Sequence, residues 1–115
     1  ERFLDDCDAD VLAFTHTGIK WQRRLRVAGR KALAVNVGVI GRPENDGTTG
    51  VWYTMIDGND GLEVQFIEIE YDHELLAAEM VAERLPKEFV QTTLTGWWTT
   101  CLEILPAKER LRGRY

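Results

Sequence analysis

The stretch DADVLAFTHTGIKW, residues 8–21, places a short apolar run directly before Thr-His-Thr-Gly. The run from Val11 to Phe14 is almost uninterrupted, which is typical of a strand that is buried on both faces. His16 follows this strand, where it is either a metal ligand or a polar residue that closes the strand. The stretch therefore predicts a sheet protein with a candidate functional residue at a strand end.

Length and composition favour one folded domain over residues 1–115, because 44% of the residues are hydrophobic and 29% are charged. The net charge of −5 argues against a dedicated nucleic-acid-binding protein. The sequence shows neither a membrane-spanning apolar run nor a signal peptide, so we expect a cytoplasmic protein with no membrane partner. Cys7 and Cys101 lack metal-type spacing and are expected to be buried, reduced thiols. The chain begins with Glu1 rather than methionine, so we expect a piece of a longer protein.

Strand signals fill the chain up to Tyr71. A first hairpin is predicted over residues 21–27 and 32–37, with a turn signal at Ala28-Gly29. A glycine-containing irregular loop follows over residues 38–47, and a second hairpin is predicted over residues 51–56 and 62–71. The sheet is therefore expected within residues 8–71.

The last predicted strand contains a change of phase. Two apolar sets alternate in opposite registers, namely Leu62, Val64 and Phe66, then Ile67, Ile69 and Tyr71. Because side chains on a strand alternate between its faces, an unbulged strand would turn one set away from the core. Either a β-bulge near Phe66 and Ile67 or a strand between two apolar layers resolves this, and both predict that these two residues are buried.

The back of the chain reads as helical over residues 72–105. Asp72 is the predicted N-cap of a helix to about Arg84, with an apolar stripe that includes Leu76, Met80 and Val81. Pro86 starts a second helix, which Gly96 ends or kinks. Apolar residues at helical spacing over 97–105 indicate a third helix, and residues 106–115 form a basic tail. The expected fold class is α/β, with a mixed, mostly antiparallel sheet and two or three C-terminal helices.

The order of these elements resembles the C-terminal half of calcineurin-like metallophosphoesterases, specifically their small bacterial phosphodiesterase branch. That branch has an aspartate, an apolar strand and Gly-His-Thr-His, then a hairpin, an Asn-Pro-Gly-Ser loop and a strand pair that ends in Tyr-Asp. Here Asp10, residues 11–14 and residues 15–18 match the first part. Residues 36–43 match the loop and residues 71–72 match the strand end, so that the resemblance covers roughly residues 8–96.

The resemblance implies half of a metallophosphoesterase α/β sandwich, from an enzyme that hydrolyses a phosphomonoester or phosphodiester with two divalent metal ions (Mn, Fe, Zn or Ni). His16 matches the first histidine of the motif and would bind one ion. Gly18 stands where the family has its second histidine, whose side chain would lie on the same side of an extended segment as His16. The family's other ligands come from motifs of its N-terminal half, which this chain lacks.

The resemblance therefore implies that the isolated chain has no phosphoesterase activity. Its partner would be a missing N-terminal half, either removed or on another polypeptide, or the chain descends from an enzyme and now does something else. Asn36 and Arg42 are candidate contacts to the substrate phosphate, because arginine offers a planar fork of donors. The alternative is that their loop is structural. His73, the other histidine, is expected to be a solvated residue at a helix start.

Two alternatives to a phosphoesterase part remain open. Basic residues crowd the hairpin 20–31 around Trp21 and could bind a single-stranded nucleic acid, although a solvated hairpin face is the more common explanation of such a pattern. A non-catalytic oligomerisation module is the other alternative. Half of the family's two-sheet sandwich would supply one sheet whose apolar face has no partner, which favours a homodimer or a complex with the missing half. The pair Trp97-Trp98 could instead cover part of that face.

Overall fold

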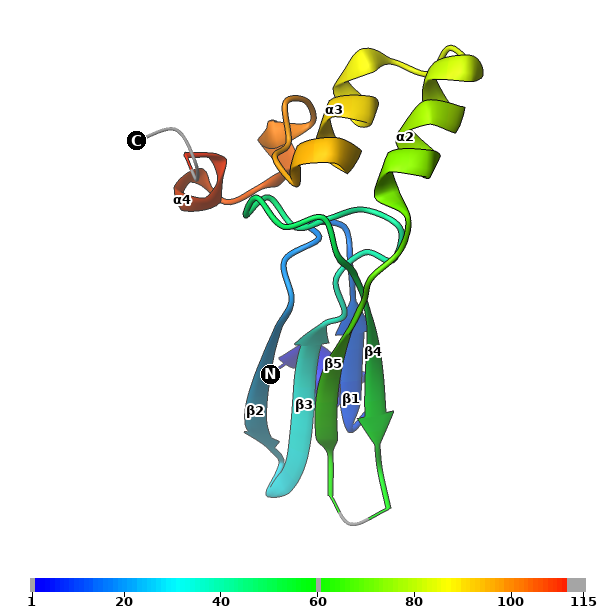
Figure 1. Ribbon diagram of the computed structural model, residues 1–115. Coiled ribbons are helices and arrows are strands. Elements are labelled where there is room, and N and C mark those ends of the chain that lie inside the picture. The colour runs from blue at the N-terminus through cyan, green and yellow to red at the C-terminus, as the bar shows by residue number, and fades with distance from the viewer. Residues whose placement is uncertain (1, 60, 112–115) are drawn as a thin grey trace.

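The computed structural model describes residues 2–59 and 61–111 (Figure 1). The elements are α1 (Arg2–Asp6), β1 (Val11–Phe14), β2 (Trp21–Val27), β3 (Arg30–Asn36), β4 (Val51–Asp57), β5 (Glu63–Ile69), α2 (His73–Ala82), α3 (Lys87–Thr95), the 3-10 turn η1 (Leu102–Ile104) and α4 (Ala107–Arg110). The α/β class is confirmed, as are both predicted hairpins.

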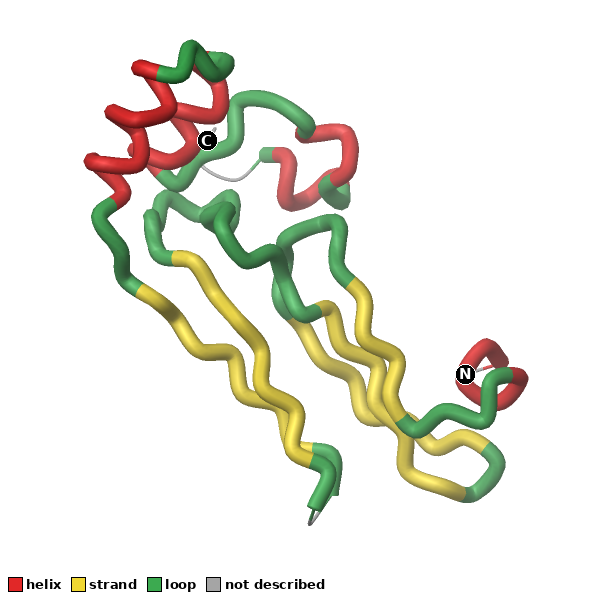
Figure 2. Tube along the Cα trace, turned by 90° about the vertical axis from the view of Figure 1, so that its right-hand side faces the viewer, coloured by secondary structure: helices red, strands yellow, loops and turns green. Residues whose placement is uncertain are grey.

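The described strands form two sheets rather than one. In the first, β3 lies between β1 and β2, parallel to β1 and antiparallel to β2. The second is the antiparallel pair of β4 and β5. The pairing is therefore mixed and mostly antiparallel, as predicted. Figure 2 shows the two sheets as separate layers, and Figure 1 places α2, α3 and α4 beyond the end at which β1 and β3 finish.

The core is centred on β3 instead of on the first strand. Leu33 and Val35 are 0% exposed and Ala32, on the opposite face of the strand, is 2% exposed. Burial on both faces suits a central strand that is hydrogen-bonded on both sides. In β1, by contrast, Ala13 is exposed, so the strand itself is confirmed but its predicted burial on both faces is wrong. α1 adds Leu4, which packs with Ala32 and Val27.

Of the two alternatives for the change of phase, the β-bulge is absent. β5 pairs with β4 in an unbroken register from Val51 opposite Ile69 to Asp57 opposite Glu63. Phe66 and Ile67 point to opposite faces of this two-stranded ribbon and are both half-buried. The change of phase is therefore accommodated because both faces of the ribbon are partly buried, so that each apolar set is partly shielded from solvent.

Both predicted helix starts are confirmed, but the predicted helix over residues 97–105 is not. Asp72 caps α2, because its carboxylate accepts a hydrogen bond from the backbone N–H of Leu75 at 2.9 Å. Gly96 ends α3 with a left-handed φ of 69°. Val81 is 61% exposed instead of lying in the buried stripe. Residues 97–101 are irregular, so the predicted third helix is wrong, and only the 3-10 turn η1 forms within residues 97–105.

Three further expectations concern the cysteines, the basic tail and membrane-spanning helices. Cys7 is exposed and Cys101 is half-buried, both as free thiols, so the prediction of buried cysteines is wrong for Cys7. α4 occupies the start of the predicted basic tail, and the tail beyond residue 111 lies outside the described residues. No helix in the described ranges is both long enough and apolar enough to cross a bilayer.

Candidate functional site

The loop that follows β1 carries the predicted metal ligand. Because β1 and β3 are parallel, this loop and the loop after β3 leave the sheet at the same end, below α2 and α3 (Figure 1). His16 has a φ of 91°, which is uncommon for a residue with a side chain. Its side chain is exposed, and its imidazole has no hydrogen-bond or ion-pair partner among the described residues. The histidine is thus available to a ligand from outside this chain.

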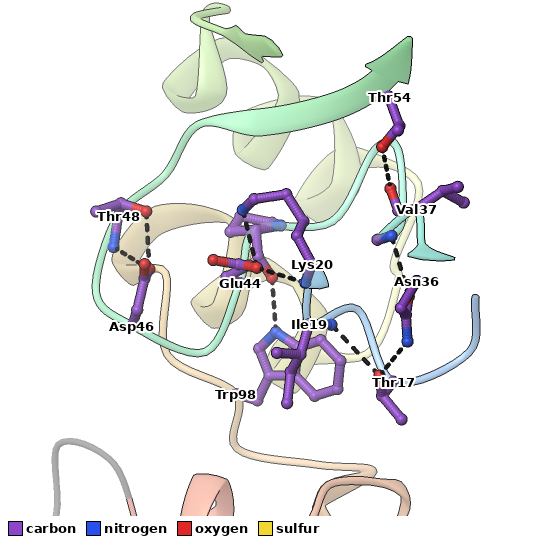
Figure 3. A network of polar contacts seen from close by, with 12 residues as sticks. Thr17, Ile19, Lys20, Asn36, Val37, Glu44, Asp46, Thr48, Thr54 and Trp98 are labelled. Atoms are coloured by element: carbon purple, nitrogen blue, oxygen red, sulfur yellow. Dashed lines mark hydrogen bonds and ion pairs between the residues drawn. The ribbon is translucent and has the colours of Figure 1, made fainter. Parts of the chain in front are cut away.

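Asn36 holds the His16 loop in place. Its side-chain amide donates a hydrogen bond to the Thr17 hydroxyl at 2.9 Å and accepts one from the Gly38 backbone N–H at 3.1 Å (Figure 3). The Thr15 hydroxyl donates to the Gly38 carbonyl. Asn36 is only 1% exposed, so both ends of its amide require partners. These contacts fit the structural alternative for Asn36.

Lys20 and Glu44 form a half-buried ion pair behind the same loop. Lys20 Nζ lies 2.8 Å from Glu44 Oε1, which also accepts the Lys20 backbone N–H at 3.0 Å (Figure 3). The ammonium lies 3.7 Å from the centre of the Trp52 ring, in a cation–π contact. The charge of Lys20 is thereby neutralised within the fold and is removed from the basic hairpin surface.

Arg42 turns toward the C-terminal segment. Its guanidinium stacks 3.4 Å from the centre of the Trp98 ring, and Nη2 donates to the Thr100 carbonyl at 3.4 Å. Burial lowers the pKa of Arg42, against the opposing effect of the nearby Cys101 thiol. The Nε of Arg42 is buried without an acceptor in the described part of the chain. The structural alternative therefore fits Arg42 as well.

Trp98 fastens the C-terminal segment to the loop after β3. The indole N–H donates to the Pro43 carbonyl at 2.8 Å, and the backbone N–H donates to Asn45 Oδ1 at 2.9 Å. The Asn45 amide in turn donates to the Glu109 carbonyl at 2.9 Å. Trp98 is 3% exposed and fills a slot beside the His16 loop.

Gly18 forms the floor of that slot. It is buried with a φ of +73°, and a Cβ at this position would lie 3.2 Å from Trp98 Cζ2. Since His16 also has a positive φ, the segment from 16 to 18 is not extended, and the expectation of an extended segment is wrong. A side chain at position 18 would meet the Trp98 indole.

The described residues do not fit a complete metal centre. They include no group of three or more His, Cys, Asp or Glu side chains that could hold a metal ion. His73 is half-buried at the start of α2, with its ring 6.2 Å from that of Tyr71. Burial raises the pKa of Tyr71, whose hydroxyl has no partner within the described ranges. The Asp72 carboxylate is used as the helix cap.

The sequence singled out His16, Asn36 and Arg42 as candidates but did not predict the residues that surround them. Glu44, Asn45 and Trp98 were not predicted to lie at this site. The one available signal was the adjacent pair Trp97-Trp98 after a helix-ending glycine, because a buried indole N–H needs an acceptor elsewhere in the fold. The acceptor itself, the Pro43 carbonyl, is a backbone group with no sequence signature.

Comparison with known proteins supports the fold. No protein-family model and no curated protein matches the chain. Among solved structures, a metallophosphoesterase from Sphaerobacter thermophilus is similar, with a TM-score of 0.65 and 21% sequence identity. The match covers 77% of this chain and 44% of that chain, so this chain spans less than half the length of that protein. The chain thus has a mixed α/β fold similar to part of a metallophosphoesterase.

Proposed function

We propose that this chain is the C-terminal part of a metal-dependent phosphoesterase that hydrolyses a phosphomonoester or a phosphodiester. The observation that carries the proposal is the similarity in fold to a metallophosphoesterase over 77% of the chain. The order of the aspartate, strand, His16 loop and hairpin, which resembles that of the family, is the second support for the proposal. A cytoplasmic location and Mn, Fe, Zn or Ni as the metal belong to the same proposal.

His16 is the residue that we assign to the metal. It lies at the carboxyl end of a strand that is parallel to its neighbour, which is where ligands of open α/β sheets bind. Its exposed imidazole and strained backbone also fit a functional residue. In two-metal phosphoesterases, two cations about 4 Å apart clamp the phosphoryl group and lower the pKa of a bound water. This chain would contribute one ligand to such a pair.

The remaining ligands would come from another part of the protein or from another chain. Gly18 has no ligating atom in its side chain, and the described residues include no further metal-binding group. β1 is hydrogen-bonded to a strand on one side only within the described residues, so a missing N-terminal half could add a strand there. We therefore infer that the isolated chain has no phosphoesterase activity.

Asn36 and Arg42 would position the loops beside the substrate phosphate and would not contact the phosphate themselves. Asn36 fixes Thr17 next to His16, and Arg42 anchors its loop to Trp98. The nucleic-acid alternative has less support, because Lys20 is paired with Glu44 and Arg30 with Asp10 at 2.9 Å. The oligomerisation alternative remains compatible with the open edges of the sheets.

The test is an assay of bis(p-nitrophenyl) phosphate hydrolysis with manganese. We expect no turnover by the isolated chain, and turnover when it is co-expressed with the polypeptide encoded upstream of Glu1. His16→Ala should abolish that turnover, because it removes a metal ligand. His73→Ala is the matched control and should retain it, since this histidine lies at the start of α2 against Tyr71.

Two outcomes would contradict the proposal. An upstream reading frame without an Asp-x-His motif would leave the chain with no source of the remaining ligands. Full turnover by the His16→Ala variant, as expected of His73→Ala, would show that His16 is not a metal ligand.

A further inference from the structure

A cavity lies between the two hairpins, at the end of the sheets that is remote from α2 and α3. It has a volume of about 420 Å³, which is within the range of cavities that bind small molecules. β2 and β3 line it with Arg24, Arg26 and Lys31, and the other hairpin lines it with Leu62 and Glu63. Figure 1 shows the turn between β2 and β3 at the same end of the molecule as the start of β5. We call this space the inter-hairpin cavity.

The three basic side chains lie on one face of the first sheet. Arg26 pairs directly with Lys31 across the strands, and Arg24 lies two residues before Arg26, so the alternation of side chains places all three on the same side. Like charges that face each other across two strands destabilise the sheet. All three side chains are exposed, and none forms a hydrogen bond or an ion pair within residues 2–59 and 61–111. Their mutual repulsion is therefore not relieved in this part of the chain.

The charge of the lining suits a dianion. Three basic side chains and one acidic side chain, that of Glu63, give the described residues of the lining a net charge of +2. The whole chain carries −5, so the cavity is a local excess of positive charge. A phosphate monoester carries two negative charges above its second pKa of about 6, and its oxygens accept the paired N–H donors of a guanidinium. A carboxylate carries a single charge and would leave half of the excess uncompensated.

We propose that the inter-hairpin cavity binds the phosphate group of a small organic phosphate monoester. Arg26 and Lys31 would contact the phosphate oxygens from two neighbouring strands, with Arg24 beside them. The half-buried side chain of Leu62 would contact the organic group of the ligand. The bound dianion would relieve the repulsion between the three basic residues.

This site is separate from the candidate metal ligand. Lys31 and Asn36 lie toward opposite ends of β3, five residues apart, which is about 16 Å on an extended strand. β2 lies at the opposite edge of the first sheet from β1, so the strand proposed for the missing half would not pair with the edge that carries the cavity. The inference therefore does not rest on phosphoesterase activity.

The test is titration calorimetry of the chain with phenyl phosphate at pH 8 and low salt, where attraction between charges is least screened. We expect binding, and we expect Arg26→Gln and Lys31→Gln each to raise the dissociation constant at least about tenfold, because each removes charge-assisted hydrogen bonds. Arg23→Gln is the matched control, since Arg23 is exposed on the same strand but lies on the opposite face. It should change the dissociation constant less than about twofold. Glu63→Gln should lower the dissociation constant, because it removes the negative charge from the lining.

Two further ligands and one further variant define the site. Benzoate has the same ring as phenyl phosphate but one negative charge, and it should bind at least about tenfold more weakly. Oligothymidylate offers the phosphates of a nucleic acid, each with a single charge, and should bind no more tightly than phenyl phosphate. His16→Ala should leave the binding of phenyl phosphate unchanged, which separates this site from the proposed metal site.

Several outcomes would overturn the proposal. Absence of binding at millimolar phenyl phosphate would do so, provided that far-UV circular dichroism shows the chain to be folded. Equal losses in Arg23→Gln and Arg26→Gln would mean that the basic hairpin attracts anions without a defined site. Benzoate that binds as tightly as phenyl phosphate would exclude a site for a dianion, and tighter binding of oligothymidylate would assign the basic surface to a nucleic acid instead.

Discussion

Gly18 and Trp98 are matched to each other in size and conformation. Glycine adopts the left-handed backbone conformation of position 18 with little conformational strain. The absence of a Cβ lets the Trp98 indole lie directly against the backbone. Trp98 in turn stacks on Arg42 and hydrogen-bonds to Pro43. Glycine at position 18 therefore has a structural reason in this chain, which is the packing of the C-terminal segment.

We expect Gly18→Ala to destabilise the fold through two separable effects. Gly29→Ala is the control, because Gly29 has a φ of +84° with no atom within 4 Å of its Cβ position. The control should lower the free energy of unfolding by about 1 kcal/mol, the conformational cost alone. Gly18→Ala should cost about 1 to 3 kcal/mol more, because the methyl group displaces Trp98. Urea denaturation measures both, and equal losses would show that the indole moves aside freely.

The candidate site could be predicted from sequence only as far as single residues. His16 and Asn36 were identified because they match positions of a motif, and both lie at the same end of the first sheet. Their hydrogen-bond partners and the positive φ of His16 were not predictable, since they depend on how the loop after β3 folds back. For the same reason, the sequence could not show that Arg42 faces Trp98.

Individual elements follow local chemistry closely, with one instructive exception. The starts of α2 and α3 coincide with Asp72 and Pro86, and Gly96 marks the end of α3. The exception is residues 97–105, where helical spacing of apolar residues did not produce a helix. Here Trp98 packs against Gly18, and Cys101 adopts a left-handed φ of 59°, so tertiary contacts prevail over the local pattern.

The Asp72 cap provides a prediction at the level of the element. Asp72→Ala should lower the free energy of unfolding by about 1 kcal/mol, because the N–H of Leu75 loses its acceptor. Asp72→Asn is the control and should retain most of the stability, since asparagine caps helices comparably well. Urea denaturation with circular dichroism detection measures both. If the two variants were equally destabilised, the carboxylate would be acting by its charge and not as a cap.

At the scale of the whole molecule, the two sheets differ in how well they are supported. β3 is hydrogen-bonded on both sides and buried on both faces, whereas β4 and β5 pair only with each other in the described residues. Four large hydrophobic side chains of that pair are more than a third exposed, namely Tyr53 at 37%, Met55 at 52%, Ile56 at 37% and Ile69 at 37%. A two-stranded ribbon has little stability without further cover.

Hydrogen exchange should reveal this difference. The amides of Leu33 and Val35 in β3 should exchange slowest, at a rate that approaches global unfolding, because both residues are 0% exposed and their N–H groups face the β1 side, where the Leu33 N–H donates to the Asp10 carbonyl at 2.8 Å. The amides of β4 and β5 should exchange faster, through local opening of the ribbon. The measurement is residue-resolved exchange of the isolated chain by NMR. Equal protection of the two sheets would show that they unfold as one unit.

The sequence by itself determined the strands, the turns between them and the starts of α2 and α3, because side-chain periodicity, capping and positive-φ glycines act over a few residues. Only the tertiary structure decided that the strands divide into two sheets and that the change of phase in β5 needs no bulge. It also decided that Trp98 occupies the space in front of Gly18. These outcomes depend on contacts between residues far apart in the chain, whose free energies no local pattern encodes.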